Sequence, residues 1–102
     1  MNLRIHRLAV AEIDHEVDYY ESRQAGLGNE LEDEIDAALL LILRFPEAAP
    51  QWRERPDRRV IALNRFPFTI PYQITHEDIV VLALAHTSCR PDYWSRRHIS
   101  AQ

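Results

Sequence analysis

The residues best suited to chemistry follow directly on the most apolar stretch of the chain. The run IVVLALA at residues 79–85 leads into HTSCRPDYWSRR at residues 86–97. Side chains placed just beyond a buried strand are held by a rigid scaffold and still reach solvent, which suits binding and catalysis. Within this segment His86 and Tyr93 could transfer a proton, and Arg90 could hold a negatively charged group. The sequence therefore predicts a functional ending, with Arg90 as its strongest candidate.

The same residues have structural interpretations. A single His at the end of a buried strand is more often a hydrogen-bonded structural residue than a base. We expect Trp94 to pack over the sheet, and for Tyr93 packing and function stay equally open. His86 and Cys89 share the H-x-x-C spacing of some zinc ligands, but no second pair of ligands follows, so we predict no metal site and no cofactor.

Arginine supplies all twelve Lys and Arg positions of the chain. The stretch RERPDRR, residues 53–59, is the densest in arginine, and we expect it to form a loop that joins the helical part to the strands. Arginine stays protonated at ordinary pH, so it binds phosphate or carboxylate but cannot act as a base. The candidates for contact with a target or with nucleic acid are Arg58, Arg59, Arg65, Arg90, Arg96 and Arg97.

These cations have simpler explanations too. The stretch RERPDRR can be a solvated loop, and Arg58 and Arg59 can pair with acids of the second helix. Arg96 and Arg97 can be an ordinary solvated terminus. Arg90 has the strongest functional claim, because an arginine at the end of a strand can reach both solvent and a ligand.

Length and composition favour one small domain over residues 1–102, since a chain of this size buries a single core. The one cysteine excludes an internal disulfide, and we see neither a signal peptide nor an apolar run of membrane-spanning length, so we expect the protein in the cytoplasm. The net charge is −4, yet residues 1–47 hold eleven acids against four Arg and residues 48–102 hold five acids against eight Arg. Within the basic half, the stretch over residues 53–59 suits contact with either nucleic acid or an acidic protein segment.

The first half of the chain has the periodicity of two helices. Residues 3–8 alternate apolar and polar and predict a strand. Apolar residues then recur every three or four positions over residues 9–23, which predicts a helix that turns Glu12 and Glu21 away from the core. The glycines of QAGLGN end this helix, and a second one is expected over residues 28–45.

The second half predicts strands. Pro71 lacks an N–H for a sheet ladder, so it requires an edge strand or a bulge. The expected elements are short strands over residues 51–55 and 58–63, a one-sided strand over 68–75, a central strand covered on both faces over 79–85, and a short helix over 91–98. The predicted fold is α+β in the order β-α-α-β-β-β, with a two-helix hairpin packed on a small, mostly antiparallel sheet and a short C-terminal helix.

Three stretches, taken in order, resemble the RelE/ParE superfamily of bacterial toxins. They are YYESRQAGLGNELEDEIDAAL at residues 19–39, RVIALNRFPFTIPYQI at 59–74 and VLALAHTSCRPDYWSRR at 81–97. The motifs YYE, GLG and RFP recur across the superfamily, as does the ending AHxxRxPxYWxxR, which here carries one extra residue before the first Arg. These proteins are the toxins of type II toxin–antitoxin modules, and the GLG hairpin and the YW ending resemble the ParE side.

The resemblance implies a fold that matches the predicted order and a protein partner. The C-terminal segment of an antitoxin wraps and neutralises toxins of this superfamily, so a toxin–antitoxin hetero-oligomer is implied, with no membrane partner. An antitoxin strand could add to an exposed edge of the sheet. ParE-like toxins inhibit DNA gyrase, whereas RelE-like toxins cleave mRNA on the ribosome.

Three functions stay open at this point: a gyrase inhibitor, a ribosome-dependent mRNA endonuclease, and a non-toxic relative kept for antitoxin binding. RNA cleavage would use Arg90 to hold the phosphate and His86 or Tyr93 as the base. RelE-like enzymes generally also use lysines, which this chain lacks. We therefore favour a gyrase inhibitor that is not an enzyme, whose arginines form a binding surface.

Overall fold

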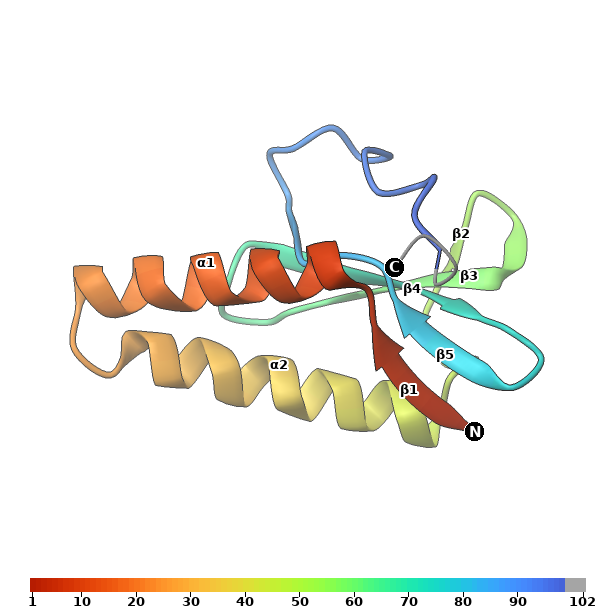
Figure 1. Cartoon of the computed structure of the whole chain (residues 1–102), viewed down its shortest axis with the longest axis horizontal. Helices are drawn as coiled ribbons and strands as arrows, with labels where there is room; N and C mark the ends of the chain where they lie inside the picture. The colour runs from red at the N-terminus through yellow and green to blue at the C-terminus, as the bar shows by residue number, and fades with distance from the viewer. Residues whose placement is uncertain (99–102) are drawn as a thin grey trace.

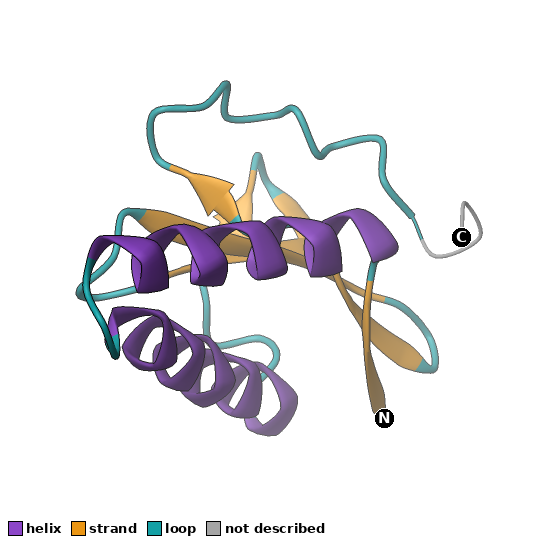
Figure 2. Ribbon diagram, turned by 60° about the vertical axis from the view of Figure 1, so that its left-hand side comes forward, coloured by secondary structure: helices purple, strands orange, loops and turns teal. Residues whose placement is uncertain are grey.

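The computed structural model describes residues 1–98 as two helices and a mixed sheet (Figure 1). The elements are β1 (Asn2–Ile5), α1 (Arg7–Arg23), α2 (Leu27–Arg44), β2 (Gln51–Trp52), β3 (Arg55–Ala62), β4 (Phe68–Ile74), β5 (Asp78–Val81) and β6 (Ala85–His86). The helices form a hairpin against one face of the sheet (Figure 2), which confirms the predicted α+β fold. Neither helix is long and apolar enough to cross a membrane, as far as the described part of the chain shows.

The strands form one sheet in the order β1-β5-β4-β3-β2, and β6 pairs with β4. β1 runs parallel to β5, and all other pairs are antiparallel, so the mostly antiparallel sheet is confirmed. Parallel neighbours need a long crossover connection. Here the helical hairpin and strands β2 to β4 lie between the two partners in the sequence.

Residues 79–85 are buried on both faces, as their uninterrupted apolar sequence predicts. Ile79 and Val81 pack in the larger core beneath the helices. The segment is not one strand, because β5 ends at Val81 and β6 begins at Ala85. The residues buried on the second face are Val80, Leu82, Ala83, Ala85 and Trp94.

Pro71 lies in a central strand, so the edge position suggested by its missing N–H is wrong. It pairs with Val60 of β3 on one side, and on the other its carbonyl accepts the Leu82 N–H at 2.8 Å. The N and C=O of one residue point to the same side of a strand, so the missing donor faces the Leu82 side. The proline therefore sits opposite the break between β5 and β6, where its lack of an N–H is tolerated.

The helical hairpin closes on two glycines. Gly26 has a φ of +90° and begins α2, whereas Gln24 ends α1 with an extended backbone. The carboxylate of Glu21 accepts the N–H groups of Gly26 at 2.9 Å and Gly28 at 3.0 Å, although the helical pattern turned it towards solvent. A Cβ on Gly28 would lie 2.6 Å from the Val17 carbonyl oxygen, so only glycine lets the two helices approach this closely.

The C-terminal segment forms consecutive turns, so the helix predicted over residues 91–98 is wrong. The N–H groups of Tyr93, Ser95 and Arg97 each donate to the carbonyl three positions earlier. The segment is instead fixed by side chains that reach different parts of the domain. Trp94 is 3% exposed, and its ring centroid lies 4.9 Å from that of Trp52, which confirms its predicted packing role.

The arginine-rich stretch over residues 53–59 is part of a hairpin, so the loop predicted there is wrong. Residues 53–54 make the turn between β2 and β3, and Arg55 already belongs to β3. Arg53 and Glu54 have φ values of 52° and 62°, and two successive left-handed residues match the twist of the flanking strands. The arginines of this stretch are thus carried on a rigid ribbon.

Candidate functional site

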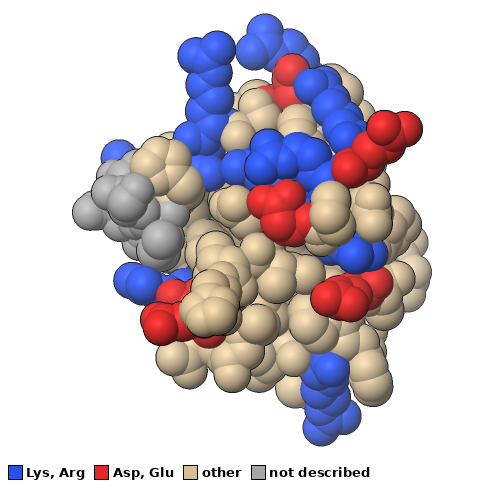
Figure 3. Space-filling view, turned by 90° about the vertical axis from the view of Figure 1, so that its right-hand side faces the viewer, with Lys and Arg blue, Asp and Glu red and all other residues tan. Residues whose placement is uncertain are grey.

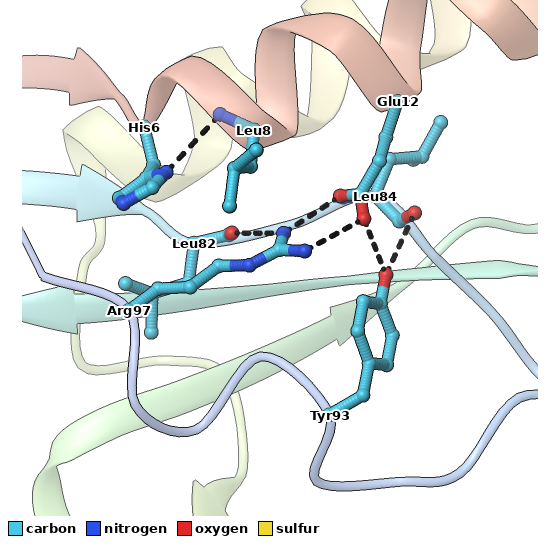
Figure 4. Close-up of polar contacts among 7 residues, drawn as sticks. All are labelled: His6, Leu8, Glu12, Leu82, Leu84, Tyr93 and Arg97. Atoms are coloured by element: carbon cyan, nitrogen blue, oxygen red, sulfur yellow. Dashed lines mark hydrogen bonds and ion pairs between the residues drawn. The ribbon is translucent and has the colours of Figure 1, made fainter. Parts of the chain in front are cut away.

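A carboxylate on α1 ties the C-terminal segment to the rest of the domain (Figure 4). Glu12 accepts hydrogen bonds from the Arg97 guanidinium through both oxygens, at 2.9 and 3.1 Å, and from the Tyr93 hydroxyl at 3.0 Å. It also accepts the Leu84 N–H at 3.1 Å, and Arg97 donates to the Leu82 carbonyl at 3.0 Å. This Glu12 cluster, made of Glu12, Tyr93, Arg97 and the backbone of Leu82 and Leu84, joins α1, the buried strand segment and the end of the chain.

The Glu12 cluster could not be predicted from the sequence. Glu12 was expected to face solvent, and Arg97 could have been an ordinary solvated terminus. The Arg97 side chain is instead only 15% exposed. The two residues lie 85 positions apart, so no local pattern in the sequence could pair them.

Tyr93 acts as a hydrogen-bond donor in this cluster. Burial raises the pKa of its phenol, and the negative charge of Glu12 raises it further, against the opposing effect of Arg97. A phenol with a raised pKa stays protonated at neutral pH. The arrangement therefore opposes proton acceptance by Tyr93.

His86 is held in a turn at the end of β6. Its Nδ1 accepts the Ser88 N–H at 3.0 Å, and its ring meets Phe68 edge to face at 5.3 Å. A backbone N–H can only donate, so the proton of the neutral ring lies on Nε2. Within residues 1–98, no group of three or more His, Cys, Asp or Glu is placed to hold a metal ion.

Two hollows share His86 and Arg90 in their linings. Together the two linings contain all three catalytic candidates, His86, Arg90 and Tyr93. The first, which we call the tryptophan cleft, has a volume of about 270 Å³ and lies on the sheet face opposite the helices. Its lining includes Trp52, Val60, Thr69, Ala85, His86, Arg90 and Trp94. The second lies beside α1. It is lined by Glu12, Glu16, Leu84, His86, Cys89, Arg90 and Tyr93.

Two more of the predicted contact arginines, Arg58 and Arg59, make internal contacts as Arg97 does, whereas the Arg65 side chain stays 61% exposed. Arg58 is buried and donates to the Ser95 carbonyl at 2.6 Å, and burial lowers the pKa of its guanidinium. Arg59 donates to the carbonyls of Glu47 and Ala49 at 2.9 and 3.0 Å. The idea that Arg58 and Arg59 pair with acids of α2 is therefore wrong. Arg65 does pair with α2, through Glu30 at 2.6 Å.

Four other arginines are exposed at one end of the molecule, and we call them the arginine end. Arginine side chains gather along the upper part of this end, with carboxylates among them (Figure 3). Asp92 contacts two of the four, Arg53 at 3.4 Å and Arg90 at 3.1 Å. Arg90 keeps 80% of its side chain exposed despite this contact. The members of the arginine end are Arg53, Arg55, Arg90 and Arg96.

The fold and comparisons with known proteins define the class as a toxin of a type II toxin–antitoxin system. The chain belongs to the ParE toxin family: the family model for the ParE toxin of the type II toxin–antitoxin system parDE matches residues 3–91. A chain in the solved chromosomal ParDE toxin–antitoxin system from P. aeruginosa has a similar fold, with a TM-score of 0.71 and 24% identity over 84% of this chain and 95% of that one. No curated protein is significantly similar in sequence.

Glu12→Gln tests the role of the Glu12 cluster. The substitution removes the negative charge and leaves the largely buried Arg97 without its ionic partner, so we expect the free energy of unfolding to fall by about 2 kcal/mol. Urea unfolding followed by tryptophan fluorescence measures the change. Asp14→Asn, at an exposed position on the same helix, is the control and should shift stability by less than about 0.5 kcal/mol. Equal stability of the two variants would contradict the assigned role.

His6 makes stability depend on pH. Its buried ring begins α1, with Nδ1 accepting the Leu8 N–H at 3.1 Å, and this contact requires the neutral ring. Burial lowers the pKa of His6 from 6.5. The charges that act on it are those of Arg97, Arg7 and His98, which lower the pKa further, and Glu12, which raises it.

Because the folded pKa of His6 lies below the unfolded value, the unfolded chain binds this proton more readily, and the protein loses stability as the pH falls below 6.5. His6→Asn keeps a helix-capping acceptor but does not titrate. We expect this variant to lose less stability than the wild type between about pH 7 and about pH 5.5, measured by urea unfolding at each pH. Parallel curves for the two proteins would show that His6 does not contribute.

Proposed function

We propose that this chain arrests growth by inhibiting DNA gyrase, without cleaving RNA, and that a cognate antitoxin neutralises it. The observation that carries the proposal is the state of the two candidate bases. Tyr93 directs its proton at Glu12, and the Nδ1 lone pair of His86 is used by the Ser88 N–H. Cleavage through a 2′-hydroxyl needs a group that accepts a proton, and the chain has no lysine to add. Membership of the ParE family supports gyrase as the target.

On this proposal the predicted arginines serve recognition in two ways. Arg90 and Arg96 are exposed and contact the target directly. Arg58 and Arg97 hold the segment that carries them, through Ser95 and Glu12. Arg59 and Arg65 fix neighbouring loops, and any contact they make with the target is secondary.

Inducing the chain without an antitoxin tests the proposed target. We expect amino-acid incorporation to continue during the first minutes while cells filament, and the purified protein to inhibit DNA supercoiling by gyrase in vitro. Arg90→Ala should weaken that inhibition by about tenfold, the value of one charge-assisted contact. A prompt collapse of protein synthesis would contradict the proposal, and no growth arrest at all would favour a non-toxic relative.

The alternative function is a ribosome-dependent mRNA endonuclease. It is favoured by the hollow beside α1, where His86, Arg90 and Tyr93 meet next to two carboxylates. In that mechanism Arg90 holds the phosphate, while His86 or Tyr93 takes the proton of the attacking hydroxyl. His86 would first have to give up its contact with the Ser88 N–H or present the other nitrogen.

An apolar groove between α2 and β3 supports the proposed antitoxin contact. It has a volume of about 430 Å³, and its lining includes Leu41, Phe45, Ile61 and Tyr72. The end of α2 beside it exposes Leu40, Leu41, Leu43 and Phe45, each by 42–59%. Apolar surface gathered in this way is typical of a protein interface.

The backbone beside this groove is also open. β2 pairs with β3 only as far as Arg59, and the next N–H, that of Val60, donates to the Pro50 carbonyl at 3.0 Å. Beyond that point no strand within residues 1–98 lies beside the outer edge of β3. An antitoxin segment that adds a strand here would pair with the edge and cover the groove with its side chains.

Leu41→Asp tests the groove as the antitoxin site. The residue is 52% exposed, so the fold tolerates the change, but a bound segment would bury the new charge. We expect affinity for the cognate antitoxin to fall at least about 100-fold, measured by calorimetry. Tyr19→Asp, at a 46% exposed position near the other end of the hairpin, is the matched control. Equal affinities of the two variants would exclude the groove.

A further inference from the structure

The tryptophan cleft lies on the face of the sheet opposite the antitoxin groove. A ligand bound in it would therefore be distinct from an antitoxin segment bound in that groove. The partly exposed Trp52 gives it an aromatic wall, the buried Trp94 packs against that ring, and Val60 and Ala85 add aliphatic surface. His86 and Arg90 also line it and supply polar groups. A ligand that fits must combine a flat apolar part with a negative charge.

The surroundings of the cleft are positively charged, although the chain as a whole is negatively charged. Residues 51–59 and 86–98, which form the hairpin and the C-terminal segment around it, hold seven arginines against three acids, whereas the net charge of the chain is −4. Three of the seven are bound inside the domain, and the four that stay exposed are Arg53, Arg55, Arg90 and Arg96. Asp92 is the carboxylate that contacts Arg53 and Arg90, and it cannot neutralise both. Arg53 also lies 4.5 Å from the centroid of the Trp52 ring, so a cation and an aromatic wall already meet at the rim.

We propose that the tryptophan cleft binds a nucleotide of single-stranded DNA, with the base against the tryptophan wall and its phosphate at Arg90. Adjacent phosphates of the strand then lie within reach of Arg53 and Arg96. Contact between a base and an aromatic side chain is worth roughly 1–3 kcal/mol per base, and it requires a base that is not already stacked in a duplex. The choice of DNA rests on the proposed function, because gyrase acts on DNA.

An acidic peptide fits the cleft less well. Carboxylates could pair with the arginines, but an acidic side chain offers no aromatic surface to the Trp52 ring. The exposed leucines and the open strand edge that suit a peptide lie at the other groove. The two surfaces thus favour ligands of different chemistry.

The fluorescence of the protein reports directly on this cleft, because its two tryptophans, Trp52 and Trp94, are the only ones in the chain. Titration of the purified full-length toxin with a twelve-residue oligothymidylate should quench the fluorescence with a saturable curve. For two or three phosphate contacts, raising the salt from about 50 to about 200 mM should weaken binding about 7-fold to 20-fold. A matched duplex of the same length should bind at least about tenfold more weakly.

Arg90→Ala should weaken binding of the oligothymidylate about tenfold and lower the salt slope by about 0.7, the loss of one phosphate contact. Arg90 is 80% exposed, so the substitution leaves the fold intact. Arg23→Ala, at the exposed far end of α1, should bind like the wild type. The same affinity in both variants would overturn the placement of the phosphate at Arg90.

Further outcomes overturn the proposal in distinct ways. If the oligothymidylate does not quench the fluorescence, the cleft does not bind DNA. If oligouridylate binds more tightly than oligothymidylate, the cleft is a site for RNA. If polyglutamate binds as tightly as oligothymidylate, it is a site for an acidic protein. Supercoiling by gyrase is measured on the same preparations. Gyrase inhibition without DNA binding removes only this inference, whereas DNA binding without gyrase inhibition removes only the proposed target.

Discussion

The paired hydrogen bonds between Glu12 and Arg97 determine how this sheet is covered. The helices protect one face, and the other is closed by a segment without regular secondary structure. Such a segment makes few backbone hydrogen bonds of its own, so side chains must hold it in place. Glu12 does so with charge-assisted bonds, and the buried Arg58 adds a second anchor at the Ser95 carbonyl. The positions of Arg90 and Trp94, and so the cleft between them, follow from these anchors.

Other glutamates of the two helices act in the same way. Glu21 accepts two backbone N–H groups at the hairpin turn. Glu34 of α2 accepts those of Asn64 and Arg65, at 2.6 and 2.9 Å, in the loop that leads into β4. The acidic surface of the hairpin is thus partly an internal scaffold, in which carboxylates bind the N–H groups of loops that no strand pairs.

Features that depend on consecutive residues could be predicted from the sequence, and features that depend on distant partners could not. The burial of residues 79–85 on both faces and the two helical periods are of the first kind. The prediction of a helix over residues 91–98 was wrong because these residues are bound to separate parts of the domain, which overrides local propensity. The edge position predicted for Pro71 was wrong because the sequence does not show the break between β5 and β6 that faces it. At the site, sequence could single out His86, Arg90 and Tyr93, but it could not show that Glu12 binds the Tyr93 hydroxyl.

The parallel pairing of β1 with β5 has a consequence for how the protein is made. Asn2 pairs with Asp78, and Arg97, the partner of Glu12, lies 85 positions after it in the sequence. The helical hairpin has local contacts and can form early during translation, whereas the first strand finds its neighbour only after most of the chain has left the ribosome. The hydrogen bonds between Arg97 and Glu12 form last of all. A nascent chain interrupted before Arg97 would carry the hairpin without the hydrogen bonds that hold the C-terminal segment on the sheet.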